Sequence, residues 1–69
     1  MEVIKLRGEF IKLGQALKAV NLVESGGDAK DEILNGNVYV NGQVELQRGK
    51  KLHAGDEVTY RGETIRIEA

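Results

Sequence analysis

A short basic run holds the residues of this chain whose type and spacing point most directly to binding chemistry. The run is Arg48-Gly49-Lys50-Lys51-Leu52-His53, with three permanent cations and one titratable group. Like charges this close repel each other, so the clustering does not help folding, and a bound polyanion would relieve the repulsion. Gly49 lets the backbone approach a phosphate closely. A solvated loop between strands explains the same run, and the residues alone leave both interpretations open.

Ser25-Gly26-Gly27, at the start of a predicted helix, is a second candidate anion site. Ser25 is a favourable helix N-cap, and unpaired backbone N–H groups at a helix start attract anions. Lys30, one turn further on, could close over a phosphate. A capped turn between helices is the favoured interpretation of the motif alone, and the nearby carboxylates of Glu24 and Asp28 oppose an anion.

A third group of polar residues, Lys12, Gln15 and Lys18, shares one face of the preceding predicted helix. Alone, this group is typical of a solvated helix face. The three groups could form one basic surface if the acidic Asp28, Asp31 and Glu32 face elsewhere. Such segregation would reconcile a local polyanion site with a formal net charge of -1 from ten basic and eleven acidic residues.

The sequence lacks the usual constellations for catalysis. It has one histidine, no cysteine, no Gly-x-Ser-x-Gly elbow and no Gly-x-x-x-x-Gly-Lys phosphate loop. Its carboxylates are spread over positions expected to be exposed, and they suggest no metal ligand set. We therefore expect no enzyme activity, cofactor, metal or small-molecule substrate.

Length and composition indicate a single domain spanning residues 1–69. The absence of cysteine fits a reducing compartment, and no apolar run approaches the roughly 20 residues of a membrane span. We expect a soluble cytoplasmic protein without a signal peptide or a membrane partner. The three aromatic residues are too few and too scattered for a platform that stacks successive bases; they are Phe10, Tyr39 and Tyr60.

Hydrophobic periodicity predicts a peripheral strand over Val3–Leu6 and two helices. The first helix, at about Lys12–Val20, buries Leu13, Ala16, Leu17 and Val20, and close packing is the only evident reason for its Gly14. The second, at about Gly27–Asn35, buries Ala29, Ile33 and Leu34, exposes Asp28, Asp31 and Glu32, and stops at Gly36.

The remainder of the chain has strand and turn patterns. Strands are expected at Val38–Val40, at Val44 and Leu46 after an Asn41-Gly42 turn, at Glu57–Tyr60, and at Thr64–Glu68 after an Arg61-Gly62 turn, with Gln47–His53 as a polar, basic segment. The predicted fold class is α+β, with two short packed, helix-turn-helix-like helices against a small, mainly antiparallel sheet.

Four segments in this order resemble the RNA-binding domain named after ribosomal small-subunit protein four, the S-four domain, over about residues 9 to 60. They are Lys12-Leu13-Gly14-Gln15-Ala16-Leu17, Val23-Glu24-Ser25-Gly26-Gly27-Asp28-Ala29-Lys30, Gly36-Asn37-Val38-Tyr39-Val40-Asn41-Gly42 and Ala54-Gly55-Asp56-Glu57-Val58. The chain is most similar to a short bacterial branch of that family. The resemblance implies recognition of structured RNA, often ribosomal.

Carried over by position, the resemblance implies RNA contacts at nine residues, and the exposed face of the first helix adds Lys18. The complete predicted site is Lys12, Gln15, Lys18, Ser25, Gly26, Gly27, Lys30, Arg48, Lys50 and Lys51. The wider family has Arg-Leu-Asp where this chain has Lys12-Leu13-Gly14, Ser-Arg where it has Ser25-Gly26, and often a basic residue at Asp31. Each change makes the site less basic, and lysine is not equivalent to arginine as a phosphate ligand.

We expect a protein that recognises ribosomal RNA or ribosome assembly intermediates, with ribosomal proteins as further candidate partners. The alternative is a protein-interaction module on the ribosome or on a regulatory partner, with little RNA affinity of its own. A third possibility is an accessory domain that reads RNA for a catalytic partner. The salt dependence of binding separates the first two, because phosphate contacts make RNA affinity fall with salt.

Overall fold

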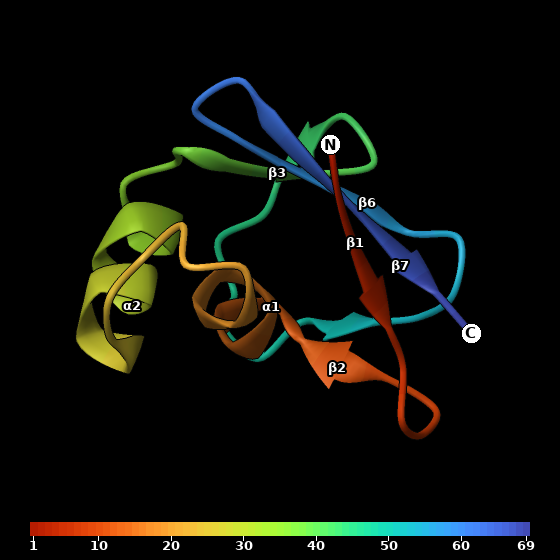
Figure 1. Ribbon diagram of the computed structural model, residues 1–69. Helices are drawn as coiled ribbons and strands as arrows, with labels where there is room; N and C mark the ends of the chain where they lie inside the picture. The colour runs from red at the N-terminus through yellow and green to blue at the C-terminus, as the bar shows by residue number, and fades with distance from the viewer.

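The computed structural model describes residues 1–69 and shows two helices on one side of a twisted sheet, with a small two-stranded ribbon beside α1 (Figure 1). The elements in chain order are β1 (Glu2–Lys5), β2 (Ile11–Lys12), α1 (Leu13–Ala19), α2 (Gly26–Leu34), β3 (Val38–Val40), β4 (Gln43–Val44), β5 (Lys51–Leu52), β6 (Glu57–Tyr60) and β7 (Glu63–Glu68). The predicted α+β class is confirmed. Neither helix has the length and apolar character needed to cross a membrane.

The main sheet has five strands in the order β1-β7-β6-β3-β4. Only the β1–β7 pair is parallel, so the prediction of a mainly antiparallel sheet is confirmed, and β1 is an edge strand as expected. The separate ribbon pairs β2 with β5 in antiparallel register, with Ile11 opposite Leu52 and Lys12 opposite Lys51.

The core lies between the helices and one face of the main sheet. The buried side chains with the largest volumes are Leu13, Leu17, Ile33, Leu52, Ile65, Ile67, Val38 and Val58. The helical spacing of Leu13, Ala16 and Leu17 and the alternation of Ile65 and Ile67 place these residues inward, as predicted.

Capping and turn residues lie at the ends of the helices and strands where the sequence predicts them. Ser25 Oγ accepts a hydrogen bond from the Asp28 amide at 3.2 Å and caps α2. Gly36 follows α2 with a φ of 79°, a left-handed conformation that glycine adopts without a steric penalty. Asn41 and Gly42 both have positive φ, at 52° and 84°, as a tight Asn-Gly hairpin requires.

The expectation that Leu34 belongs to the core is wrong, because Leu34 is 57% exposed to solvent. At about 100° per residue, Leu34 lies about 140° around the helix from Ala29, whereas Ile33 lies almost above it. Only Ala29 and Ile33 of the three predicted residues are buried.

The predicted interpretation of residues 44–53 is also partly wrong. Strand β4 ends at Val44, and both Val44 and Leu46 are exposed. Leu52, placed in a polar segment by the sequence pattern, is fully buried in β5 and pairs with Ile11 of β2. A two-residue strand is too short to show a period, so neither half of the ribbon was predicted.

Candidate functional site

Basic residues of β2, of α1 and of the loop before β5 meet at one open hollow of about 310 Å³. None of its lining residues is hydrophobic or acidic; they are Lys12, Gly14, Gln15, Lys18, Gly26, Arg48 and Gly49. The structure thus brings together residues from all three groups that the sequence singled out. Those of the predicted site that line the hollow are Lys12, Gln15, Lys18, Gly26 and Arg48.

Backbone hydrogen bonds hold the basic loop against the start of α1. The amide of Leu13 donates to the carbonyl of Lys50 at 2.9 Å, and the amide of Gly14 donates to that of Arg48 at 3.1 Å. Gln15 Oε1 accepts from the amide of Lys12 at 3.2 Å. Because these bonds occupy the first amides of α1, this helix offers side chains to a ligand rather than free N–H groups.

Gly14 is buried where α1 meets Arg48, which confirms close packing as its role. A β-carbon at this position would lie 2.8 Å from Cγ and 3.4 Å from Cδ of Arg48. Contacts below 3.0 Å between carbon atoms are repulsive, since the optimal separation is about 3.5–4.0 Å. The missing side chain therefore makes room for the arginine stem at the hollow.

The start of α2 supplies the free amides. The amides of Gly26 and Gly27 belong to the first helical turn and have no acceptor within the helix. Gly26 lines the hollow, whereas Gly27 does not. Ser25 is committed to the cap, and Lys30 is exposed further along α2, outside the hollow.

Lys50 and Lys51 line a neighbouring hollow of about 320 Å³ together with Glu45, His53 and Asp56. Both signs of charge are present there. The His53 amide donates to Asp56 Oδ2 at 2.8 Å, and this bond is the main cause that lowers the pKa of Asp56 below its usual 3.8, against an opposing effect of burial. A hydrogen bond from Asn41 and the positive charges nearby lower that pKa further.

The cations of the predicted site have no acidic partner in the structure. The two salt bridges are Arg61–Glu32 at 3.1 Å and Arg66–Glu57 at 2.7 Å, and neither involves a residue of that site. In the β2–β5 ribbon, Lys12 even lies directly opposite Lys51. Like charges directly opposite each other destabilise a strand pair, so the two lysines lower the stability of the free protein. A bound anion would offset this repulsion.

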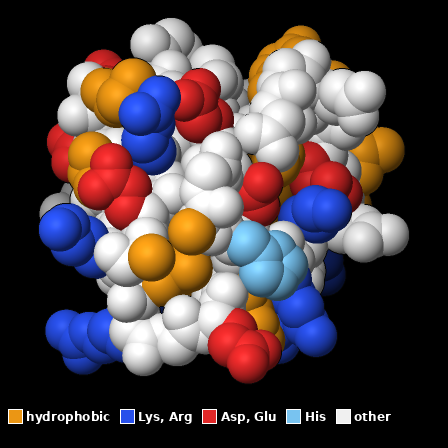
Figure 2. Space-filling model, turned by 90° about the vertical axis from the view of Figure 1, so that its right-hand side faces the viewer, with side chains coloured by type: hydrophobic (Ala, Val, Ile, Leu, Met, Phe, Trp, Pro, Cys, Tyr) orange, Lys and Arg blue, Asp and Glu red, His pale blue; other side chains and the backbone are white.

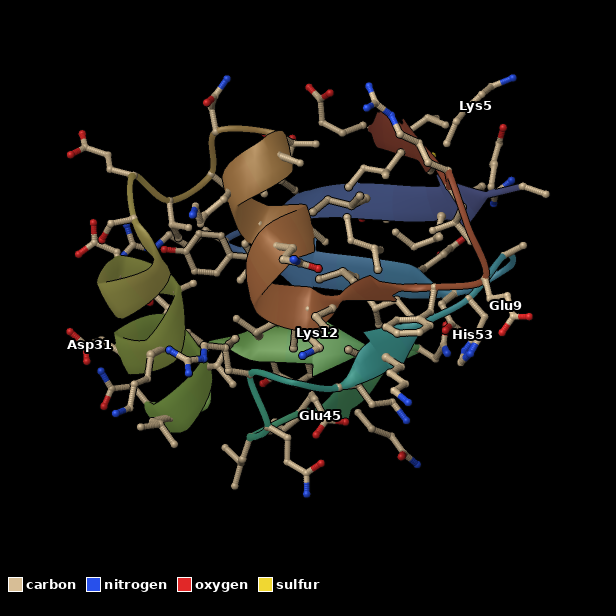
Figure 3. All side chains as sticks on the ribbon, turned by 90° about the horizontal axis from the view of Figure 1, so that it is seen from below. Lys5, Glu9, Lys12, Asp31, Glu45 and His53 are labelled. Atoms are coloured by element: carbon tan, nitrogen blue, oxygen red, sulfur yellow. The ribbon has the colours of Figure 1, made fainter.

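The acidic residues of α2 gather in a third hollow, away from the basic one. It measures about 270 Å³ and is lined by Leu22, Val23, Glu24, Asp28, Asp31, Glu32 and Tyr60. Figure 3 shows Asp31 on the side of α2 that faces away from Lys12. Burial is the main cause that raises the pKa of Tyr60, and the charge of Glu32 adds to it. The prediction that Glu32 faces water is only partly right, because it is half-buried between Arg61 and Asn37.

The segregation of charge is local. Figure 2 shows basic and acidic side chains mixed around the single histidine, His53, on another face of the molecule. Glu45, the first residue of the loop that leads to β5, is drawn just below Lys12 in the view of Figure 3. The acid-free region is therefore the hollow lined by Lys12, Lys18 and Arg48, which we call the basic hollow.

Two features near the basic hollow lie outside the predicted site. Gly49, which the sequence indicated as a point of close backbone approach, lines the hollow together with Gly14, which was identified only as a packing residue. Phe10 stands next to the ribbon, with the ammonium nitrogen of Lys51 4.8 Å from its ring centroid and the His53 ring 6.3 Å away. The sequence places Phe10 two residues before Lys12. Only the pairing of β2 with β5, which was not predicted, shows that Phe10 lies beside Lys51 and His53. Nowhere in the structure do three or more His, Cys, Asp or Glu side chains lie close enough together to hold a metal ion.

Comparison with known proteins shows similarity to small bacterial proteins. The family model described as "S4 domain", the S-four domain, matches residues 4–68. The chain is 41% identical over 59 residues to "Probable ribosome maturation protein RlbA" of Bacillus subtilis, covering 86% of this chain and 83% of that protein.

Two solved structures share the fold. YbcJ from Escherichia coli, whose solution structure is described as revealing an ALFAL motif involved in RNA-binding, is 33% identical with a TM-score of 0.76, covering 100% of this chain and 89% of YbcJ. Heat Shock Protein 15 from Vibrio cholerae, solved as a trimer, is 28% identical with a TM-score of 0.74, covering 88% of this chain and 65% of that one.

Proposed function

This chain belongs to the S4 domain family, and from that premise we propose that it binds structured RNA through the basic hollow. The observation that carries the proposal is that Lys12, Lys18 and Arg48 line one hollow together with Gly26 at the start of α2, with no acidic residue in the lining. The motif involved in RNA-binding in YbcJ, which shares this fold, supports the same function.

The chemistry of the hollow suits a phosphate backbone. Arg48 offers a planar fork of donors that can hold two phosphate oxygens, while the lysines act as point charges. Gly26 adds a backbone donor at the positive end of α2. Contacts of this kind position a protein on RNA and carry little sequence information, so recognition rests on the shape of a helix or junction.

The remaining residues of the predicted site extend this surface in our proposal. Lys50 and Lys51 continue it past the ribbon, and Lys30 continues it along α2 from the amide of Gly27. With about five phosphate contacts, the logarithm of the affinity should fall with the logarithm of salt concentration with a slope of roughly -4.

We propose ribosomal RNA, or a ribosome assembly intermediate that contains it, as the natural ligand, and ribosomal proteins as neighbours in that complex. The name of the Bacillus subtilis relative, which refers to ribosome maturation, supports this choice. Crosslinking in cells followed by sequencing of the attached RNA tests it, and recovery of messenger or transfer RNA alone would contradict it.

The direct test of RNA binding is a titration of a fluorescein-labelled RNA hairpin at several salt concentrations. The double variant Lys12→Gln/Arg48→Gln should bind more weakly and with a smaller salt slope. Arg61→Gln/Arg66→Gln is the charge-matched control, because both arginines lie outside the basic hollow and pair with Glu32 and Glu57. No binding at low salt, or a slope near zero, would reject the proposal and favour a protein-interaction module.

A further inference from the structure

A fourth hollow, of about 390 Å³, lies between β1, the loop that follows it, β2 and the end of α1. It has an apolar floor with cations at its edge and no acidic lining residue; its lining is Ile4, Lys5, Leu6, Arg7, Gly8, Phe10, Ile11 and Ala19. We propose that this hollow, which we call the Phe10 hollow, holds one unpaired base of the bound RNA. The inference rests on the proposed function and adds what the RNA must contain.

Phe10 provides the wall on which a base can stack. The residue is 39% exposed although it is one of the largest apolar residues in the chain. Lys51 Nζ lies 4.8 Å from the ring centroid, and the His53 ring is tilted by 54° at 6.3 Å. Lys51 lies in β5 and His53 directly follows it, so the ring is held in place beside the paired ribbon rather than at a loose loop tip.

The chemistry of the Phe10 hollow fits a nucleotide better than it fits a purely apolar ligand. A base has an apolar face and is joined to a phosphate, and the hollow combines apolar side chains with Lys5 and Arg7. Proteins that bind single-stranded RNA use this combination of aromatic stacking and adjacent positive charge. The Lys51 ammonium beside the ring adds a third cation for the same phosphate backbone.

The Phe10 hollow and the basic hollow are lined by adjacent residues of the chain in β2 and α1. Ile11 and Ala19 line the first, while their chain neighbours Lys12 and Lys18 line the second. One RNA can therefore place phosphates on Lys12 and Lys18 while a neighbouring base reaches Phe10. This geometry favours a junction between a duplex and a single strand over an uninterrupted duplex.

The test compares two fluorescein-labelled RNA hairpins that are identical except for a single-stranded 3′ overhang of adenosines and uridines. The unaltered protein should bind the overhang hairpin more tightly. Phe10→Ala should weaken binding of that hairpin about 5- to 150-fold, the range of one stacked base, and leave the blunt hairpin within about twofold. Tyr39→Ala is the matched control, because Tyr39 is 41% exposed on β3, away from the lining of the Phe10 hollow.

Two further variants protect the test against a folding defect. Phe10→Leu keeps an apolar side chain without an aromatic face and should lose the overhang preference as Phe10→Ala does. Phe10→Trp should keep it, and because the chain has no other tryptophan, its fluorescence should be quenched by the overhang hairpin alone.

Each other result rejects the inference. An equal loss on both hairpins would show that Phe10 acts only through folding, and unchanged binding of both would show that its ring does not meet RNA. If the unaltered protein binds both hairpins equally, the base site is absent although RNA binding stands. If it binds neither, the proposed function itself fails.

Discussion

Gly14 and Arg48 are packed so closely that a β-carbon on the glycine would lie 2.8 Å from Cγ of the arginine. The amide of Gly14 also donates to the carbonyl of Arg48 at 3.1 Å. The backbone of the basic loop and the stem of its arginine are thus fixed against the first turn of α1. We infer that Gly14 is a positioning residue, which acts on a ligand only through Arg48.

Gly14→Ala should weaken RNA binding several-fold and reduce the salt slope by about one, the effect of losing one phosphate contact. Its effect on the free energy of unfolding should stay within about 1 kcal/mol, because the better helix propensity of alanine offsets the crowding. Leu34→Ala is the control, since Leu34 is 57% exposed on α2 and lines neither the basic hollow nor the Phe10 hollow.

A double variant shows whether Arg48 carries the effect of Gly14. In an Arg48→Gln background, Gly14→Ala should change RNA affinity little, because the contact that it disturbs is already gone. Equal effects of Gly14→Ala in both backgrounds would mean that the two residues act independently, and the positioning role would be rejected.

Lys12→Gln should change folding and binding in opposite directions. Lys12 lies opposite Lys51 in the ribbon, so removing its charge should raise the free energy of unfolding by about 0.2–1 kcal/mol at low salt. The same change removes a cation from the basic hollow and should lower RNA affinity. Urea unfolding and RNA titration measure the two effects, and a loss of both stability and affinity would contradict this view of the lysine pair.

Asp56 should make the protein more stable above its folded pKa than below it. Its carboxylate accepts from the His53 amide at 2.8 Å and from Asn41 Nδ2 at 3.1 Å, and these bonds lower its pKa below the usual 3.8. The unfolded chain therefore binds the proton more tightly. The stability due to Asp56 is fully present above pH 3.8 and is lost as the pH falls through the lower, folded pKa.

Asp56→Asn should flatten that acidic part of the stability profile, measured as the free energy of urea unfolding against pH. Asp31→Asn should leave the profile unchanged, because its exposed side chain makes no hydrogen bond. A profile of Asp56→Asn that still falls with acid as steeply as that of the unaltered protein would assign the effect to another carboxylate.

Local residue chemistry predicts the parts of this fold that depend on neighbours in sequence. The Ser25 cap, the left-handed Gly36 and the Asn41-Gly42 turn are set by side-chain size and backbone freedom, so the sequence predicts them correctly. The five residues of the predicted site that line the basic hollow come from three segments, but their order along the family's motif was enough to group them.

The features that depend on distant pairing could not be predicted. The β2–β5 ribbon joins residues some forty positions apart in two-residue strands, and it alone explains why Lys12 meets Lys51 and why Phe10 meets His53. A basic run surrounding Leu52 resembles a solvated loop until its partner strand is known. For the same reason, the sequence could not separate Lys50 and Lys51, in a hollow of mixed charge, from Arg48 in the acid-free one.

The ribbon also predicts which leucine after β4 matters for stability. Leu52 is fully buried against the core, whereas Leu46 is 53% exposed, although the sequence pattern assigned them the reverse roles. Leu52→Ala should lower the free energy of unfolding by about 2–5 kcal/mol through lost burial and the cavity that it leaves. Leu46→Ala should change it by less than about 0.5 kcal/mol. Because a domain of this size is marginally stable, the Leu52 variant should be largely unfolded by circular dichroism near body temperature, and equal losses in the two variants would rule out the ribbon as part of the core.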